Sequence, residues 1–493
     1  MSHTVVVTSL LIVLDRSSAT PLYRQVYEGY RAAIVERRLR PGDRLPSTRS
    51  LAAELGISRL PVVNAFEQLV AEGYCEGLVG SGTYVTRSLA GELSPIDPSG
   101  SRPGKRPRPG PRVLSRTSAR LVRAPAPWLR HFGPFRVGDV AIDQFPLKVW
   151  SHLLARHGRT MVPSLLRYGD AMGYWPLREA IASYLRAARS ARCEAEQVMI
   201  VSGSQQALTI AARAVVDPDS EVWVEEPGYW GVQNALVASN ARLVPVPVDE
   251  EGLNVGHGIE RAPRATAAFI TPSRQLPLGT TMSAPRRMQL LDWARRRGAW
   301  VIEDDYDSEL RYATFPIAAL QGLDRDSRVI YIGTFSKVVF PSIRSAYLVI
   351  PRDLVSRFVM VRRTLDICPP ISSQVVLAEF IREGHFARHL RRMRQLYSER
   401  RRVLVECLHQ ELDERVRYIG EPAGTDLVVL LPKGTRDLPL SERAAEEGLW
   451  LMPLSDRYLG RPARQGFVLG YGGTSVEEIP PAVRRLRTLL DQV

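Results

Sequence analysis

The 493-residue sequence has no apolar run approaching the roughly 18 residues that a membrane-spanning helix requires, so no membrane segment is predicted. A short apolar patch at residues 10–14 has no positively charged segment before it and no small-residue cleavage site after it. Residues 1–14 are therefore a poor signal peptide, and we expect them to form a short arm or an edge strand.

Cysteine is also scarce, with four residues that lie far apart in the sequence and form no CxxC pair. This spacing excludes a disulfide framework and a zinc site built on paired cysteines, and no metal site is predicted. A chain without structural disulfides is expected in a reducing compartment, here the cytoplasm.

The length and the charge distribution are more informative. The chain is too long for one ordinary domain, and its 45% hydrophobic content is ample for a packed core. The net charge of +14 is uneven: residues 87–130 carry ten Lys or Arg against two acidic residues, whereas residues 1–86 carry nine arginines against eight. Concentrated basic charge indicates contact with a polyanion, although a solvated linker is an equally good interpretation.

Residues 15–86 are predicted to form a compact first unit. Apolar residues at helical spacing predict a helix within residues 21–39. Ser47 is expected to cap a second helix that ends at Gly56, and Ser58 to cap a third helix after a very short turn. Two helices joined in this way form a helix-turn-helix, whose second helix enters the major groove of DNA.

A glycine-punctuated, β-like segment at residues 74–85 would form the wing of a winged helix, although any small helical domain could share these periodicities. The motifs LPSTR (45–49), LGISR (55–59) and GSGTYV (80–85) closely resemble the winged-helix domain of the GntR family of bacterial regulators. Two positions depart from that family, which usually has polar residues where this chain has Leu60 and Pro61. The residues that the resemblance places at DNA are Ser47, Arg49, Ser58, Arg59, Leu60, Pro61 and the wing glycine Gly80.

The segment 87–130 shows no periodicity and is rich in Pro, Arg, Ser and Gly. This composition predicts a semi-extended basic linker. Its charge would add a salt-sensitive, non-specific attraction to DNA phosphates.

From residue 131 to residue 493, apolar strands alternate with helices, which predicts an α/β domain with a mostly parallel sheet. The ligand of an open α/β sheet binds at the carboxyl ends of the strands. The polar turns that follow the strands should therefore converge on one site. The five apolar strands that run into such turns are residues 198–202, 221–225, 267–270, 300–302 and 328–332.

The last of these turns contains Lys337, flanked by Thr334 and Ser336 and followed by Arg344. A lone lysine beside a strand is normally a solvated surface charge. A lysine held where a strand ends, beside two hydroxyls and a guanidinium, also suits pyridoxal phosphate (PLP), which attaches to lysine as a Schiff base.

The other strand ends carry the remaining groups that PLP needs. Asp304 would pair with the pyridine nitrogen, Tyr306 would donate to the ring oxygen, and Tyr229 would supply an aromatic face. Each residue alone could be an ordinary loop or core residue, but the complete set favours a cofactor site. The residues expected around the phosphate are Gly203, Ser204 and Gln205 at a helix N-terminus, with Thr334, Ser336 and Arg344.

The motifs YGDAMGYWPLR (168–178), EDDYDSE (303–309) and GTFSK (333–337) resemble a fold-type-I aminotransferase domain. Together with the GntR-like unit, they identify nearly the whole chain as similar to the MocR family of PLP-dependent transcriptional regulators. The resemblance implies a homodimer, commonly head-to-tail, with each winged helix resting on the other subunit. It also implies double-stranded operator DNA and a small-molecule effector as partners, the effector being an amine, an amino acid or PLP itself.

Two departures from the aminotransferase pattern leave alternatives open. Arg274 stands where the family usually has a histidine, and Val468 stands where an arginine normally grips the substrate carboxylate. Either Arg457, Arg461 or Arg464 substitutes for that arginine, or the effector is not a conventional amino acid.

We therefore expect a regulator with at most a residual half-reaction of transamination. The alternative is an active aminotransferase with an appended DNA-binding unit. A domain that has lost PLP is disfavoured, because the lysine, the carboxylate, the tyrosine and the arginine of the predicted site are all present.

Overall fold

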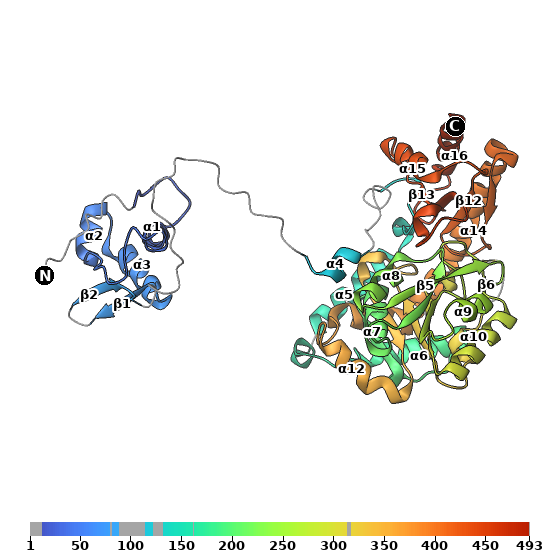
Figure 1. Ribbon diagram of the computed structural model, residues 1–493, viewed down its shortest axis with the longest axis horizontal. Helices are drawn as coiled ribbons and strands as arrows, with labels where there is room; N and C mark the ends of the chain where they lie inside the picture. Colours follow the sequence, from blue (N-terminus) through green and yellow to red (C-terminus); the bar gives the residue numbers. More distant parts are fainter. Residues whose placement is uncertain are drawn as a thin grey trace. The chain divides into compact units, whose positions relative to one another are not determined.

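The computed structural model describes residues 12–78, 81–87, 114–121, 132–160, 162–312 and 317–492. The chain divides into two compact units, residues 1–112 and residues 113–493, and Figure 1 shows the elements of each. The wing glycine Gly80, most of the predicted N-terminal arm and most of the predicted basic linker lie outside the described residues.

The first unit is a winged helix, as predicted. Its core lies between the helices, where Tyr30 and Phe66 meet edge to face with their ring centroids 5.3 Å apart. Its elements are the helices α1 (Leu22–Val35), α2 (Thr48–Leu55) and α3 (Arg59–Ala71) and the antiparallel hairpin β1 (Cys75–Leu78) and β2 (Gly82–Val85).

The helix ends of this unit follow the sequence except at one cap. The Ser47 hydroxyl accepts a hydrogen bond from the Ser50 amide at 3.1 Å, and Gly56 ends α2 in the left-handed conformation. Ser58 begins α3 as predicted, but its side chain makes no capping hydrogen bond. The third residue of α3 is Pro61, and it lacks the N–H that an N-cap side chain commonly binds at that position.

The larger unit is built on an eight-stranded sheet in the order β3-β10-β9-β8-β7-β4-β5-β6. The pairs from β9 through β8, β7 and β4 to β5 are parallel, whereas β10 is antiparallel to both of its neighbours. Strand β3 therefore points the same way as β9, and the five predicted strand ends lie at one edge. The strands are β3 (Val198–Val201), β4 (Glu221–Glu226), β5 (Arg242–Asp249), β6 (Gly252–Leu253), β7 (Ala267–Ile270), β8 (Trp300–Asp305), β9 (Val329–Thr334) and β10 (Ala346–Val349).

Buried apolar side chains cover both faces of this sheet, which explains why its strands are almost continuously hydrophobic. On one side of β4, Trp223 stacks on Trp293 of α10 with ring centroids 3.9 Å apart. The helices of this lobe are α5 (Leu147–Thr160), α6 (Trp175–Arg189), α7 (Ser204–Val215), α8 (Trp230–Ala238), α9 (Val255–Arg261), α10 (Ala284–Arg297), α11 (Leu320–Leu323), α12 (Val355–Arg363) and α13 (Ile371–Arg382).

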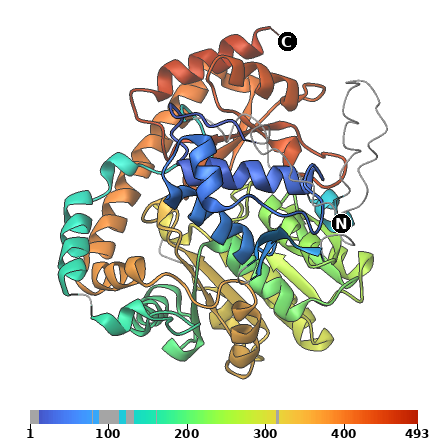
Figure 2. The ribbon, with the colours of Figure 1, turned by 90° about the vertical axis from the view of Figure 1, so that its left-hand side faces the viewer.

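A smaller C-terminal lobe carries a four-stranded antiparallel sheet in the order β11-β12-β14-β13. The long helix α14 packs against α13 of the large lobe and against α16 of the small lobe (Figure 2), so one element spans both. The elements of this lobe are α14 (His385–Leu412), β11 (Arg417–Ile419), β12 (Asp426–Leu430), α15 (Asp437–Glu446), β13 (Met452–Pro453), β14 (Gly466–Gly470) and α16 (Ile479–Leu490).

A short helix, α4 (Arg116–Arg120), lies within the range predicted as linker. It packs on α8, and the Thr117 hydroxyl donates a hydrogen bond to Asn240 at 2.9 Å. The larger unit therefore begins before residue 131. Hydrophobic periodicity could not predict this, because α4 is attached through polar contacts.

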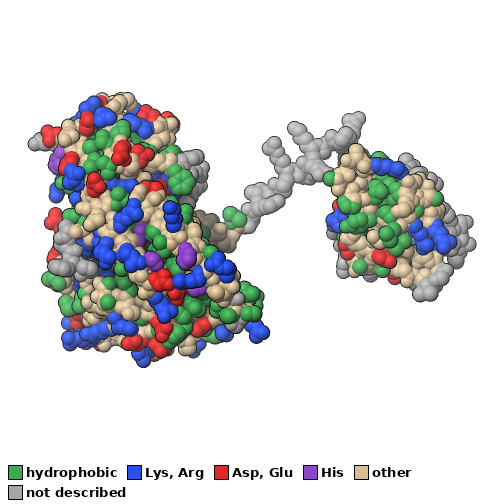
Figure 3. Space-filling view, turned by 180° about the vertical axis from the view of Figure 1, so that it is seen from behind, with side chains coloured by type: hydrophobic (Ala, Val, Ile, Leu, Met, Phe, Trp, Pro, Cys, Tyr) green, Lys and Arg blue, Asp and Glu red, His purple; other side chains and the backbone are tan. Residues whose placement is uncertain are grey.

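Within the described ranges, no helix is both long enough and apolar enough to cross a membrane. On the face of the larger unit seen in Figure 3, Lys and Arg side chains are interspersed with Asp and Glu. That face therefore presents a mixed surface rather than a single basic patch.

Candidate functional site

A cavity of about 220 Å³ opens at the carboxyl edge of the parallel strands, between the two lobes of the larger unit. Seven of the predicted cofactor residues line it: Ser204, Tyr229, Asp304, Tyr306, Thr334, Ser336 and Lys337. Gly203, Gln205 and Arg344 lie beside the cavity rather than on its wall. The convergence expected from the five strand ends is therefore present in the fold.

Lys337 follows β9 and is half-buried, with its side chain on the cavity wall. Burial lowers the pKa of its ammonium group, and Asp426 and Asp307 oppose that shift through their negative charges. A lowered pKa leaves more of the amine neutral and nucleophilic at neutral pH, as a lysine that forms a covalent bond requires.

The two adjacent aspartates of the EDDYDSE motif have different roles. Asp305 accepts hydrogen bonds from Arg189 Nη2 at 2.7 Å and from the Tyr331 hydroxyl at 2.6 Å, so it is a buried structural residue. Asp304 lines the cavity, and no described residue donates to its Oδ1. Both belong to β8, which runs to residue 305 rather than ending at residue 302 as predicted.

Burial raises the pKa of Asp304 to about 7, and the neighbouring charge of Asp305 adds to that shift. A buried, charged carboxylate without a hydrogen-bond donor lowers the stability of the folded state. A cationic group placed in the cavity would therefore stabilise the charged form of Asp304 and satisfy its unpaired oxygen.

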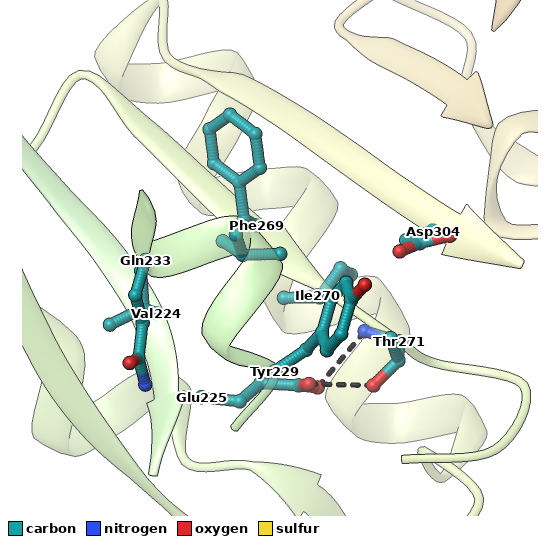
Figure 4. A pocket seen from close by; sticks show the side chains of 9 residues that line it. Val224, Glu225, Tyr229, Gln233, Phe269, Ile270, Thr271 and Asp304 are labelled. Atoms are coloured by element: carbon teal, nitrogen blue, oxygen red, sulfur yellow. Dashed lines mark hydrogen bonds between the residues drawn. The ribbon is translucent and has the colours of Figure 1, made fainter. Parts of the chain in front are cut away.

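Tyr229 stands at the start of α8 and lies beside a second, smaller cavity of about 10 Å³ that Asp304 also lines (Figure 4). The floor of this cavity is a polar network in which Glu225 accepts hydrogen bonds from the Thr271 amide at 3.0 Å and the Thr271 hydroxyl at 2.6 Å. These bonds fix the ends of β4 and β7, so Tyr229 rests on a rigid base.

The N-terminus of α7 forms the opposite end of the site. Gly203 has a φ of +106°, and a Cβ at this position would lie 2.6 Å from Arg344 Nη2. The guanidinium of Arg344 therefore packs directly against Gly203, and its Nη2 donates to the Ser202 carbonyl at 2.8 Å. The Gln205 amide group instead donates to the Gly231 carbonyl at 2.9 Å, so this predicted residue braces α8 with its side chain.

The unexpected arginine Arg274 is fully buried behind the cavity. Its Nη1 donates to the Tyr306 hydroxyl at 2.8 Å and to Asp307 at 3.0 Å, and its Nη2 donates to Asp426 at 2.8 Å. Arg274, which departs from the family pattern, is thus paired with the carboxylates of Asp307 and Asp426.

Of the three arginines proposed to replace the missing carboxylate grip, only Arg457 lines the cavity. It is 3% exposed, no described residue accepts from its Nε, and its nearest carboxylate, that of Asp456, is 3.9 Å away. Arg461 and Arg464 are exposed, and Val468 is buried in β14 between β12 and β13.

The large lobe holds the Arg457 loop in place. The Gly228 amide donates to the Arg457 carbonyl at 3.0 Å, and the Glu226 carboxylate accepts from the amides of Leu459 and Gly460. The cavity wall thus carries a poorly neutralised guanidinium, whose Nη2 donates to Met452 Sδ at 2.8 Å and whose charge could attract an anionic group.

Sequence reasoning missed several residues on the cavity wall. Gly138 is one of them, and a Cβ at this position would lie 3.7 Å from Lys337 Nζ. Most of these residues are apolar or glycine and carry no reactive group, so only the tertiary fold places them at the cavity. The remaining wall residues absent from the predicted set are Val137, Trp230, Thr271, Leu276 and Met452.

In the first unit, the predicted DNA-contacting side chains of α2 and the start of α3 are mostly exposed, and Leu60 is 66% exposed despite being apolar. Arg59 Nε donates to the Thr48 hydroxyl at 3.0 Å, which fixes the start of α3 against α2. Ser47 is occupied as a helix cap. The described residues thus place Arg49, Arg59 and Leu60 on the surface of the helix-turn-helix.

Comparison with known proteins matches both units. The family model for bacterial regulatory proteins of the GntR family matches residues 22–85, and the model for class I and II aminotransferases matches residues 135–484. The chain therefore joins a GntR-type winged helix to an aminotransferase-type unit.

Two relatives share this arrangement along almost their whole length. A probable rhizopine catabolism regulatory protein, MocR, of Rhizobium meliloti is 39% identical over 97% of this chain and 95% of its own length. A pyridoxine biosynthesis transcriptional regulator, PdxR, of Corynebacterium glutamicum is 32% identical over 94% of each chain. The chain belongs to the MocR family of transcriptional regulators.

The larger unit also resembles a solved enzyme. The α-aminoadipate aminotransferase LysN of Thermus thermophilus, crystallised with N-(5'-phosphopyridoxyl)-L-leucine, superposes with a TM-score of 0.71 and 29% identity, covering 77% of this chain and 97% of that enzyme. An aminotransferase-type fold of this kind holds a PLP derivative in that enzyme.

Proposed function

We propose that this protein regulates transcription by binding operator DNA through its winged helix and PLP in the cavity of its larger unit. One observation carries the proposal: Lys337 and Asp304 line the same cavity, and no described residue donates to Asp304 Oδ1. The same chain also carries a DNA-binding unit.

The cavity residues fit PLP group by group. The start of α7 at Ser204, together with Thr334 and Ser336, would hold the phosphate through N–H and hydroxyl donors. Asp304 would bind the ring nitrogen, and the side chain of Tyr229 would lie against the ring. When bound, the cofactor supplies an electrophilic carbon that amines can attack and a ring that withdraws electrons.

The effector is proposed to compete with the Lys337 amine, as an amino acid or another amine would. Arg457 favours an effector with a carboxylate, because its guanidinium reaches the cavity without close neutralisation. PLP itself remains a second effector class. Either event would favour one degree of closure between the lobes, and we propose that closure sets the spacing of two winged helices.

Two winged helices can have a defined spacing only in a homodimer. The larger unit has an exposed apolar surface that could form the dimer interface. Large apolar side chains are exposed along α5 and the turn after it, where Leu147 is 65%, Leu166 73% and Tyr168 84% exposed. Such a cluster on a protein of this size indicates an interface. A C2 dimer would present two winged helices to paired half-sites, in the head-to-tail arrangement expected of the family.

A spectroscopic experiment tests the cofactor part of the proposal. Purified protein incubated with PLP should show an absorbance band at roughly 400–430 nm. The Lys337→Ala variant should not show that band. The chain has only four lysines, at positions 105, 148, 337 and 433. Borohydride reduction followed by peptide mapping should therefore place the label on Lys337, and a label elsewhere would refute the assignment.

An aminotransferase activity is the second candidate, and the position of Arg457 favours it, since the site does not lack an arginine after all. The two functions differ in turnover. Holoprotein incubated with amino acids and 2-oxo acids should convert less than one equivalent per site if the protein is a regulator. Sustained multiple turnover would establish the enzyme instead.

A further inference from the structure

We propose that Arg274 is a positioning residue that orients the Tyr306 hydroxyl toward the bound cofactor and ties this orientation to the place of the C-terminal lobe. The inference rests on the proposed cofactor site and adds a link between that site and the lobe that closes over it. Nothing in the alternation of strands and helices points to this residue.

The contacts of Arg274 join its own segment to two others. It follows β7, and its Nη1 lies 2.8 Å from the Tyr306 hydroxyl oxygen and 3.0 Å from Asp307, both just after β8. Its Nη2 lies 2.6 Å from the Asp426 carbonyl and 2.8 Å from the Asp426 carboxylate, at the first residue of β12. One guanidinium thus joins the large lobe to the small one.

The hydrogen-bond chemistry fixes the direction of the Tyr306 proton. A guanidinium can only donate, so the phenol oxygen must accept from Arg274. The O–H of Tyr306 is then available to an acceptor in the cavity, which this residue lines. In the proposed complex that acceptor is the ring oxygen of PLP.

Packing shows that the site is shaped for this side chain. Arg274 is 3% exposed, and a Cβ at Gly424, just before β12, would lie 2.4 Å from Arg274 Cζ. Gly424 also has a φ of +75°, which disfavours a side chain for an independent reason. The turn that precedes β12 therefore closes directly onto the guanidinium.

The same network surrounds the attachment lysine. The charged groups that act on Lys337 are Asp426, Asp307, Arg274 and Asp139, and those that act on Tyr306 are Arg274, Asp307 and Asp426. If the small lobe moved away with Asp426, both the charge around Lys337 and the partner of Arg274 would change. Lobe position and cofactor state are linked through one residue.

The test follows the visible absorbance of PLP-loaded full-length protein as pH is varied. Arg274→Gln removes a positive charge and the donor to Tyr306, so the midpoint of the absorbance change should rise by about one pH unit or more. Because the residue acts through Tyr306, the same substitution in a Tyr306→Phe background should give less than half that rise.

Arg311→Gln is the matched control, because Arg311 also joins the two lobes: it pairs with Glu421, and its Nη1 donates to the Thr281 hydroxyl at 3.0 Å. Its midpoint should stay within about 0.2 units of the parent protein, well below the shift expected from a removed neighbouring charge. If Arg274→Gln does not fold, Arg274→His keeps a ring donor and is measured in the same two backgrounds.

An unchanged midpoint in the Arg274 variants, or an equal rise with and without the Tyr306 hydroxyl, would overturn the inference. A parent protein that shows no visible band at all would instead refute the proposed cofactor site. The two failures are therefore distinguishable in one set of spectra.

Discussion

Neighbouring residues of the same type serve opposite purposes in this site. Asp305 is held by Arg189 and Tyr331, whereas the Oδ1 of Asp304 has no donor among the described residues. The sequence shows only an acidic pair. Which carboxylate faces the ligand depends on the pleat of β8, since successive side chains point to opposite faces of a strand.

The raised pKa of Asp304 gives a prediction about stability. Between the ordinary value of 3.8 and about 7, the folded chain holds a proton on Asp304 that the unfolded chain has released. Stability of the cofactor-free protein should therefore fall as pH rises through that window. Asp304→Asn removes this loss and should stabilise the cofactor-free protein by about 1–3 kcal/mol at pH 7.5.

The gain should vanish near pH 4, and the variant should bind PLP more weakly. Thermal unfolding at both pH values measures the first effect, and cofactor titration measures the second. A variant that binds PLP as tightly as its parent would contradict the role assigned to Asp304.

Arg457 gives a second prediction at this scale. PLP-loaded protein should prefer each amino acid over the amine formed by its decarboxylation, because Arg457 would bind the carboxylate. Arg457→Gln should reduce that preference by roughly 10- to 100-fold, as expected for a lost charge-assisted hydrogen bond. Absorbance titrations with the paired compounds measure it.

The exposed Arg461→Gln provides the control and should leave the preference within about twofold, as expected for a surface charge remote from the ligand. An equal loss in both variants would mean that the effect comes from overall charge and not from the cavity.

At the scale of elements, hydrophobic patterning predicted five strands of the large sheet and the helices of the first unit, whereas the winged-helix assignment also needed the motifs LPSTR, LGISR and GSGTYV. Five apolar runs predicted five parallel-sheet strands whose ends share an edge, and the structure confirms that arrangement. The limits of β8 were misjudged because Glu303, Asp304 and Asp305 are acidic yet buried within a strand. Their partners come from distant segments, which a local pattern cannot reveal.

The two serine caps of the winged helix give an element-scale prediction. Ser47 caps α2 through the Ser50 amide, whereas Ser58 makes no side-chain cap at α3. Ser47→Ala should destabilise the unit by about 1 kcal/mol, and Ser58→Ala should change its stability by less than about 0.3 kcal/mol.

Hydrogen exchange of the first-turn amides of α2 reports the loss at the helix itself. Equal destabilisation by the two alanine substitutions would contradict the capping geometry.

At the scale of the whole molecule, the sequence predicted the order of the two units and the type of ligand, but it did not predict the details of the site. Motifs predicted PLP, but the arginine nearest the cavity could not be selected from three candidates in one loop. Selection depends on the contacts of Glu226 and Gly228 with that loop, which lie more than two hundred residues away in sequence.

The proposed dimer is tested by the exposed apolar surface of the larger unit. Sedimentation should find a dimer for the parent protein, and Leu166→Arg should weaken it by at least about tenfold, because burying an unpaired charge is costly. Met360→Arg, at a residue of α12 in the larger unit that is 60% exposed, is a matched control and should leave the dimer intact. A monomeric parent protein would refute the proposed pairing of winged helices.

The most direct measurement of the central claim is binding of full-length protein to the DNA upstream of its own gene, with and without PLP. We expect the affinity or the footprint of the parent protein to change when PLP is added. Lys337→Ala should bind the same DNA and show no change. If the variant responds to PLP as the parent protein does, Lys337 is not the point through which this regulator reads its ligand.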